Sequence, residues 1–118
     1  MGWRVLAIDD DRDFLDLLSQ GFEQHGHTVV GCETVGGAIA ELEESGEFDL
    51  VLTDLGLADD GGLALLERLR EARPNVPVMV VTGHGEAEAA ALALGAAGVL
   101  VKPVELSSLL EAAQKIMV

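Results

Sequence analysis

The sequence is poor in cysteine and in aromatic residues, and each shortage excludes a class of protein. Cys32 is the only cysteine in 118 residues, so no intrachain disulfide can form and a disulfide-stapled secreted scaffold is excluded. Because Cys32 lies in an apolar run, we expect a buried, inert thiol rather than a catalytic one. Aromatic residues make up 3% of the chain, with no tyrosine, so the core must be built from Val, Leu, Ile and Ala.

Basic residues are also scarce, with 7 Lys and Arg against 21 Asp and Glu, which gives a formal net charge of −14. Nucleic acid and anionic lipid both require neutralising Lys and Arg, so we predict neither direct nucleic-acid binding nor membrane binding. The chain shows no basic segment followed by the apolar stretch of a signal peptide. No apolar run approaches the roughly 20 residues that span a bilayer. We therefore expect a soluble, cytoplasmic protein.

What the chain has is 49% apolar residues, arranged as short β-type runs that alternate five times with helical stretches. The expected strands are Arg4–Ile8, Thr28–Cys32, Leu50–Thr53, Val78–Val81 and Gly98–Val101. The expected helices are Asp13–His25, Val35–Ser45, Gly62–Arg73, Glu86–Leu94 and Glu105–Met117. Continuous apolar strands are typical of a parallel sheet covered on both faces, and the alternation implies right-handed βαβ crossovers. We predict a single α/β domain over residues 1–118.

Polar residues stand where the apolar runs stop. Asp9 and Asp10 follow the first run, and Asp54 follows the third. Thr82 and Lys102 follow the fourth and fifth runs. Because ligands of an open parallel sheet bind outside the carboxyl ends of its strands, we expect these side chains to converge on one pocket. Three carboxylates, a hydroxyl and an ammonium there would suit a divalent cation and a phosphoryl group.

The acidic residues at the first strand end would repel one another without a cation. At about 4 Å and an effective dielectric near 20, each like-charge pair costs up to roughly 4 kcal/mol. Mg²⁺ removes that cost and favours one or two carboxylates with water and phosphate oxygens. Asp11 is instead expected to cap the following helix. Asp54 is a candidate nucleophile, because a carboxylate can form an aspartyl phosphate, although alone it could be a turn residue.

Lys102 is costly at the end of a buried strand unless it pairs with a carboxylate or a phosphate. A structural salt bridge to Asp54 and a clamp on phosphoryl oxygens are both compatible with this position. Pro103 restricts the Lys102 backbone to extended conformations and allows a cis bond between the two residues. Thr82 could be an ordinary strand residue, or its hydroxyl could approach a phosphoryl group past the small Gly83.

The ordered set of motifs resembles a receiver (response-regulator) domain of bacterial two-component signalling, such as the chemotaxis response regulator, over essentially the full length. The matching segments are the acidic pair Asp9-Asp10, DLVLTDLGL around Asp54, VVTGHG around Thr82, and GAAGVLVKP ending in Lys102-Pro103. The resemblance implies a flavodoxin-like, doubly wound (βα)5 fold with a five-stranded parallel sheet of order 2-1-3-4-5. It also implies a regulatory phosphoacceptor that assists its own phosphorylation and dephosphorylation, not an enzyme.

The resemblance further implies a role for each site residue. Asp54 would accept a phosphoryl group from a phosphohistidine on a sensor histidine kinase or a histidine phosphotransfer protein. Asp10, Asp54 and the backbone carbonyl of Gly56 would bind Mg²⁺, or Mn²⁺ in its place, while Asp9 would act largely through water. Lys102 would pair with the phosphoryl group and Thr82 would move to hydrogen-bond it. The change would be read on the surface of residues 86–94, 98–101 and 105–117, where an effector domain or a second copy would bind.

The chain departs from the family pattern at a few positions. Val99 replaces the usual Tyr or Phe, so we expect a smaller surface change on switching. Ala58 replaces the usual proline of the loop after Asp54. Gly56 and His84 flank the expected phosphate position: Gly56 offers no side chain, and His84 could screen the site, assist a water or remain idle. We assign no role to His25 and His27.

Three other functions compete with a phosphoacceptor. A flavin or nucleotide binder would need a Gly-rich loop after the first strand, where this chain has Asp9-Asp10-Asp11. A phosphatase or mutase with an aspartyl nucleophile would need a cap, for which 118 residues leave no room. The third is a receiver-like interaction module that no longer uses phosphorylation, which Val99 and Ala58 keep open.

Overall fold

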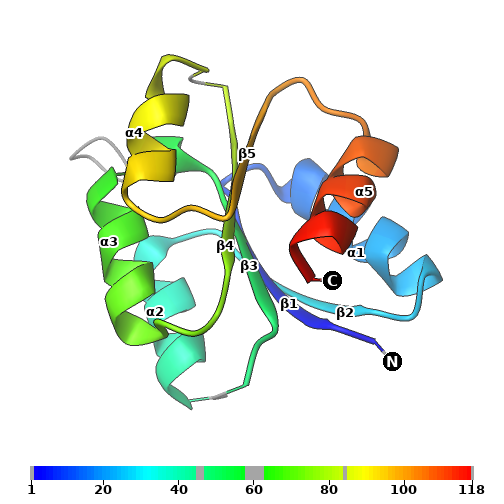
Figure 1. Ribbon diagram of the computed structural model, residues 1–118. Coiled ribbons are helices and arrows are strands. Elements are labelled where there is room, and N and C mark those ends of the chain that lie inside the picture. The colour runs from blue at the N-terminus through cyan, green and yellow to red at the C-terminus, as the bar shows by residue number, and fades with distance from the viewer. Residues whose placement is uncertain (1, 45–46, 58–62, 84, 118) are drawn as a thin grey trace.

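The carboxyl ends of all the strands lie at one edge of a parallel sheet, as the alternating pattern predicts. The structure is a computed structural model that describes residues 2–44, 47–57, 63–83 and 85–117. In the described part of the chain, five strands pair in parallel in the order β2-β1-β3-β4-β5 (Figure 1). The strands are β1 Arg4–Ile8, β2 Thr28–Cys32, β3 Leu50–Thr53, β4 Val78–Thr82 and β5 Gly98–Val101. The predicted flavodoxin-like sheet is confirmed.

Helices cover both faces of this sheet. The helices are α1 Arg12–Gln24, α2 Val35–Glu44, α3 Leu63–Ala72, α4 Glu88–Ala93 and α5 Leu106–Met117, with short 3-10 turns η1 Leu55–Leu57 and η2 Gly85–Ala87. Figure 1 shows α1 and α5 on one face and α2, α3 and α4 on the other. None of the described helices is long and apolar enough to cross a membrane.

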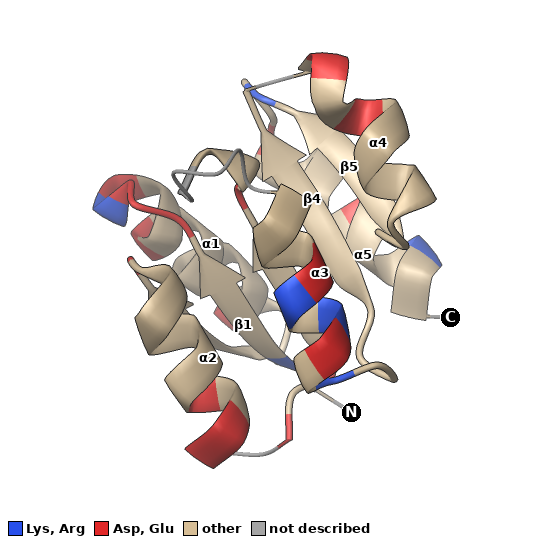
Figure 2. Ribbon diagram, turned by 90° about the vertical axis from the view of Figure 1, so that its left-hand side faces the viewer, with Lys and Arg blue, Asp and Glu red and all other residues tan. Residues whose placement is uncertain are grey.

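Alternate residues of the central strands face two separate hydrophobic clusters. Leu6 and Ile8 of β1 pack with α2 and α3, whereas Val5 and Ala7 pack with α1 and α5. β3 and β4 are divided between the clusters in the same way, and their side chains are buried throughout. The apolar runs of these strands are continuous because both faces are covered. Acidic residues are accordingly found on the helices and loops around the sheet (Figure 2).

The edge strands β2 and β5 are only partly covered, and this corrects one prediction. Cys32, the last residue of β2, is half-buried rather than buried. Burial still raises the pKa of its thiol, with a smaller contribution from the charge of Glu41. A raised pKa leaves little thiolate at neutral pH, which favours an inert thiol even though the residue is not fully buried.

Helix boundaries follow the local capping chemistry. Asp11 caps α1, because its carboxylate accepts hydrogen bonds from the backbone N–H groups of Asp13 and Phe14, and this prediction is confirmed. Gly95 has φ +101°, the left-handed conformation expected of a glycine that ends a helix. The predicted helix over 86–94 is shorter, since α4 begins only at Glu88, after the η2 turn. Ser45 and Gly62, predicted as helix ends, lie outside the described residues.

Candidate functional site

The strand register brings predicted site residues together from four strand ends. Ile8 of β1 pairs with Thr53 of β3, so Asp9 and Asp54 leave neighbouring strands at the same level. The Asp54 backbone N–H donates to the Ile8 carbonyl at 3.1 Å. On the other side, the Lys102 backbone N–H donates to the carbonyl of Thr82 at 2.8 Å. Backbone hydrogen bonds therefore fix where each of these side chains starts.

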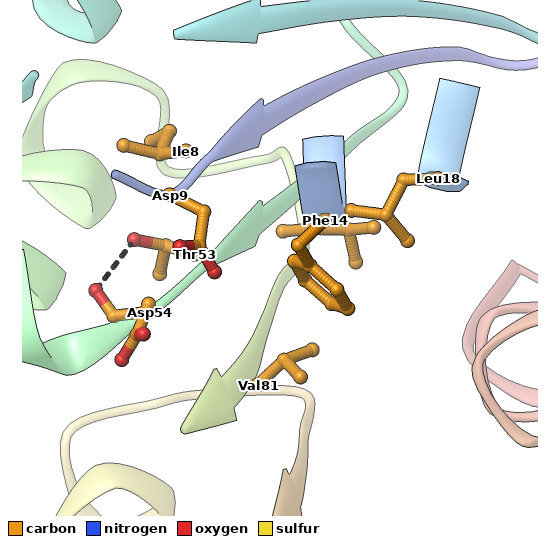
Figure 3. Close-up of a pocket in the computed structure, with 8 residues that line it drawn as sticks. Ile8, Asp9, Phe14, Leu18, Thr53, Asp54 and Val81 are labelled. Atoms are coloured by element: carbon orange, nitrogen blue, oxygen red, sulfur yellow. Dashed lines mark hydrogen bonds between the residues drawn. The ribbon is translucent and has the colours of Figure 1, made fainter. Parts of the chain in front are cut away.

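A small pocket lies beside Asp54 and has room for about one water molecule (Figure 3). Polar atoms of Asp9, Thr53 and Asp54 contribute to its lining, and the remaining lining is apolar. The apolar lining residues are Ile8, Phe14, Leu18, Leu52 and Val81. Figure 3 shows the Phe14 ring across the pocket from Asp54. One side of the carboxylate pair is thus screened from bulk water by side chains of α1 and β4.

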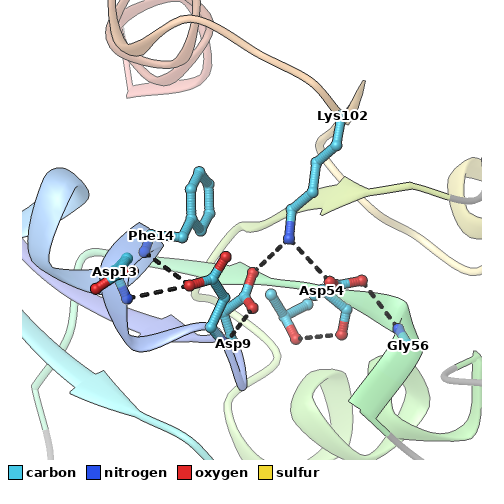
Figure 4. Close-up of polar contacts among 8 residues, drawn as sticks. Asp9, Asp13, Phe14, Asp54, Gly56 and Lys102 are labelled. Carbon is cyan, nitrogen blue, oxygen red and sulfur yellow. Dashed lines mark hydrogen bonds and ion pairs between the residues drawn. The ribbon is translucent and has the colours of Figure 1, made fainter.

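The ammonium of Lys102 lies between two carboxylates (Figure 4). Its Nζ is 2.7 Å from Asp9 Oδ2 and 3.0 Å from Asp54 Oδ2. The Asp9 side chain is only 3% exposed, whereas that of Asp54 is 15% exposed. A carboxylate as enclosed as Asp9 needs a charged partner, and Lys102 supplies it for both acids at once.

The same contacts keep Lys102 charged. Burial alone would lower the pKa of the ammonium, but hydrogen bonds to Asp9 and Asp54, together with their charges, outweigh that effect and raise the pKa. Lys102 therefore keeps its positive charge at neutral pH.

The second oxygen of each carboxylate is held by backbone. Asp9 Oδ1 accepts from the Asp11 N–H at 2.9 Å, and Asp54 Oδ1 accepts from the Gly56 N–H at 2.9 Å. Gly56, in the η1 turn, thus contacts Asp54 through its backbone N–H, whereas the role predicted for it concerns its carbonyl. Both carboxylates are oriented by the chain that follows them, so Lys102 meets groups that are already in place.

Thr82 is the last residue of β4 rather than the first residue after it, and its side chain is fully buried. Gly83, the next residue, is exposed. The Lys102–Pro103 peptide bond is cis.

Asp10 does not join the cluster that the sequence predicts. Its side chain is exposed and makes no hydrogen bond or ion pair with another described residue. Consistent with this, the described residues contain no group of three or more His, Cys, Asp and Glu arranged to hold a metal ion. The donor chemistry nevertheless fits Mg²⁺, which prefers carboxylate oxygen, and the position between Asp9 and Asp54 already accommodates a cation in the form of the ammonium.

Phe14 is a site residue that we did not predict from the sequence. It lies in the first turn of α1, and its ring centroid is 4.6 Å from Lys102 Nζ. The available signal was its place four residues before Leu18, on the same face of an amphipathic helix and nearer the strand ends. Val99, at the position of the usual aromatic residue, is half-buried and packs against the cluster that includes Ala91 of α4. Ala58 and His84 lie outside the described residues.

Comparison with known proteins identifies the family. The chain is 34% identical over 110 residues to the photosynthetic apparatus regulatory protein RegA of Rhodobacter capsulatus, covering 92% of the chain and 59% of that protein. It is 31% identical over 113 residues to the transcriptional regulatory protein ZraR of Salmonella typhimurium, covering 94% of the chain and 25% of that protein. The chain therefore spans only part of the length of these relatives.

Solved structures agree with the sequence comparison. The crystal structure of a CheY-like response regulator receiver domain protein from Methanospirillum hungatei superposes with a TM-score of 0.90 at 34% identity, covering 99% of the chain and 94% of that structure. The family model described as the response regulator receiver domain matches residues 5–114. The chain therefore belongs to the response regulator receiver domain family, whose members are regulatory domains of two-component systems.

Proposed function

We propose that residues 1–118 form one receiver domain in which Asp54 accepts a phosphoryl group from a phosphohistidine. The donor would be a sensor histidine kinase or a histidine phosphotransfer protein. The observation that carries this proposal is the ammonium of Lys102 between Asp9 and Asp54. Asp54 is the more exposed of these two carboxylates, so it is the one that a donor can reach.

The transfer needs little beyond positioning and charge neutralisation. A carboxylate oxygen of Asp54 attacks phosphorus, the phosphorus–nitrogen bond breaks, and its electron pair returns to the imidazole of the donor. Lys102, already hydrogen-bonded to Asp54 Oδ2, would neutralise part of the charge on the phosphoryl oxygens. Thr82, at the end of the neighbouring strand, would supply a hydrogen bond to the same group.

We propose that Mg²⁺ or Mn²⁺ is held by Asp9, Asp10, Asp54 and the Gly56 carbonyl. When bound, the ion would neutralise charge on the phosphoryl oxygens. Of these residues, Asp9 and Asp54 already face a cation, whereas Asp10 would have to turn toward it.

The partners of the phosphorylated domain are proposed to dock on the surface formed by α4, β5 and α5. Leu92 of α4 and Val101 of β5 are large apolar side chains left 46% and 44% exposed there. An effector domain or a second copy could cover them. Val99 has no aromatic ring that could rotate on phosphorylation, so the structural change at this surface should be small. With a net charge of −14, the domain itself should not contact nucleic acid.

Phosphorylation with a small donor tests the proposal directly. The protein, Asp54→Asn and the matched control Asp16→Asn, an exposed acid of α1, are incubated with acetyl phosphate and Mg²⁺. Intact-mass spectrometry should find one added phosphoryl group on the wild-type protein and on Asp16→Asn, and none on Asp54→Asn. If the wild-type protein gains no phosphate, the chain is instead a receiver-like module that does not use phosphorylation.

A further inference from the structure

The Phe14 ring contacts the charged end of Lys102. Lys102 Nζ lies 4.6 Å from the ring centroid, within the range of a cation–π interaction. Figure 4 shows the ring beside the lysine side chain, above the two carboxylates that the ammonium contacts. The ammonium is therefore held by three groups: Asp9, Asp54 and the face of Phe14.

Phe14 also separates two spaces around the site. On one side it lines the small pocket that Asp9 and Asp54 also line. On its outer side it lines an open hollow with Asp11, Lys102, Pro103 and Val104. The ring thus stands between the carboxylates and the solvent on the α1 side.

The position of Phe14 is fixed independently of Lys102. Its backbone N–H donates to the capping carboxylate of Asp11 at 3.2 Å, in the first turn of α1. Its side chain packs against the buried cluster that contains Leu18 and Phe22. A ring anchored in this way can restrain the flexible four-carbon stem of a lysine.

We propose that Phe14 is a positioning residue that holds the Lys102 ammonium at Asp54 through the face of its ring, and so sets the rate of phosphoryl transfer. This inference rests on the proposed function. During transfer the Asp54 oxygens change charge and partners, whereas the ring of Phe14 does neither. The ring can therefore keep the ammonium in place while the new bond forms.

Substitutions that separate ring shape from ring charge test this role. Wild-type protein is compared with Phe14→Leu, with Phe14→Tyr, and with mono-, di- and trifluorinated phenylalanine at position 14. Phe14→Leu should slow phosphorylation by acetyl phosphate by about two- to fivefold, the size expected of a partly exposed cation–π contact. Phe14→Tyr should retain the rate, and the fluorinated rings should slow it progressively as electron density leaves the ring face.

Nuclear magnetic resonance of the phosphate-free protein gives a readout that does not depend on phosphorylation. The ε-methylene protons of Lys102 should show an upfield ring-current shift in the wild-type protein and in Phe14→Tyr, and lose it in Phe14→Leu. Leu17→Ala, which removes an exposed side chain of the same helix, should change neither the shift nor the rate.

Either of two results overturns the inference: Phe14→Leu reacts as fast as wild type, or Phe14→Tyr slows as much as Phe14→Leu. The second would assign Phe14 a packing role only. If the wild-type protein is not phosphorylated at all, the proposed function fails. In that case the ring-current shift of the Lys102 ε-methylene protons alone decides whether the Phe14 ring holds the ammonium. If the wild-type protein shows no such shift, the positioning role of Phe14 is overturned as well.

Discussion

Lys102 is held by two carboxylates that differ in their access to solvent. Asp9 is almost enclosed and Asp54 is partly exposed, so the lysine neutralises a buried charge and a reachable one together. Sequence spacing could predict that these residues meet, because parallel strands end at one edge. It could not predict that Asp9 makes the shorter contact. That contact depends on the Asp11 N–H, which holds one oxygen of Asp9 and leaves the other for Lys102.

His27, to which we assigned no role from the sequence alone, makes a local contact that should respond to pH. Its ring stacks on Trp3 with centroids 4.0 Å apart and planes 8° apart, and its Nδ1 accepts the Trp3 backbone N–H. Burial, and then the charge of His25, lower the pKa of His27 below its ordinary value of 6.5. Below about pH 6.5 the unfolded chain therefore binds more protons than the folded one. The His27 contribution to the free energy of unfolding should be complete above that pH and fall as the pH drops through the folded pKa.

The fluorescence of Trp3, the only tryptophan, reports this titration directly. A protonated imidazole stacked on indole quenches its emission, so intensity should fall with a midpoint below pH 6.5. His27→Gln should abolish the transition, and His25→Gln should move the midpoint upward by removing a neighbouring charge. A midpoint at or above 6.5 in the wild-type protein would contradict the lowered pKa.

The strands could be predicted from the sequence because burial and strand pairing determine them. The start of a helix was harder to predict because it depends on capping. β1, β3 and β4 are buried on both faces, so continuous apolar runs in the sequence predict them. β4 extends one residue further than predicted, to Thr82, because that residue still pairs with Val101 of β5. The start of α4 is different. An Ala-rich segment favours helix, but Ala87 at the cap offers no side-chain acceptor, and the turn before it stays 3-10.

The packing of α1 on α5 depends on a glycine inside a helix. A Cβ added to Gly21 would lie 2.1 Å from Leu106 Cδ2 and 2.8 Å from its Cγ. Alanine normally favours a helix by about 1 kcal/mol over glycine, but this overlap forces the two helices or the leucine to move. Gly21→Ala should therefore lower the free energy of unfolding by about 1–2 kcal/mol, measured by urea denaturation.

Two companion variants show whether the contact is the cause. Gly36→Ala, in α2, adds a Cβ with no atom within 4 Å and should be neutral or stabilising by up to about 1 kcal/mol. In a Leu106→Ala background, Gly21→Ala should cost less, because the added methyl group enters the space left by the leucine. Equal costs in both backgrounds would mean that Leu106 is not the limiting contact.

Over the whole molecule, negative charge is in large excess and one part of it is gathered at the sheet edge. The net charge of −14 opposes compaction, so any added salt should stabilise the fold to some extent by screening. Asp9, Asp10 and Asp54 lie at one edge, where a single lysine offsets two of the three. A divalent cation bound there would stabilise the folded state only. Specific binding can therefore be told apart from general screening by comparing salts at the same ionic strength.

Magnesium should therefore stabilise the protein more than sodium at the same ionic strength. Binding to the native state alone adds RT ln(1 + [L]/Kd), or about 1.4 kcal/mol when free Mg²⁺ is about tenfold above Kd. Thermal unfolding in Mg²⁺ and in matched NaCl should show this difference in the wild-type protein and in Asp16→Ala, an exposed acid outside the site. Asp10→Ala should lose most of the magnesium-dependent stabilisation, because the exposed Asp10 carboxylate beside the site is free to turn onto the ion. Without metal, the same substitution should change the free energy of unfolding by no more than about 0.5 kcal/mol. If magnesium stabilises Asp10→Ala as much as the wild-type protein, Asp10 is not a ligand of the ion. The remaining carboxylate ligands would then be Asp9 and Asp54, which contact Lys102 in this structure.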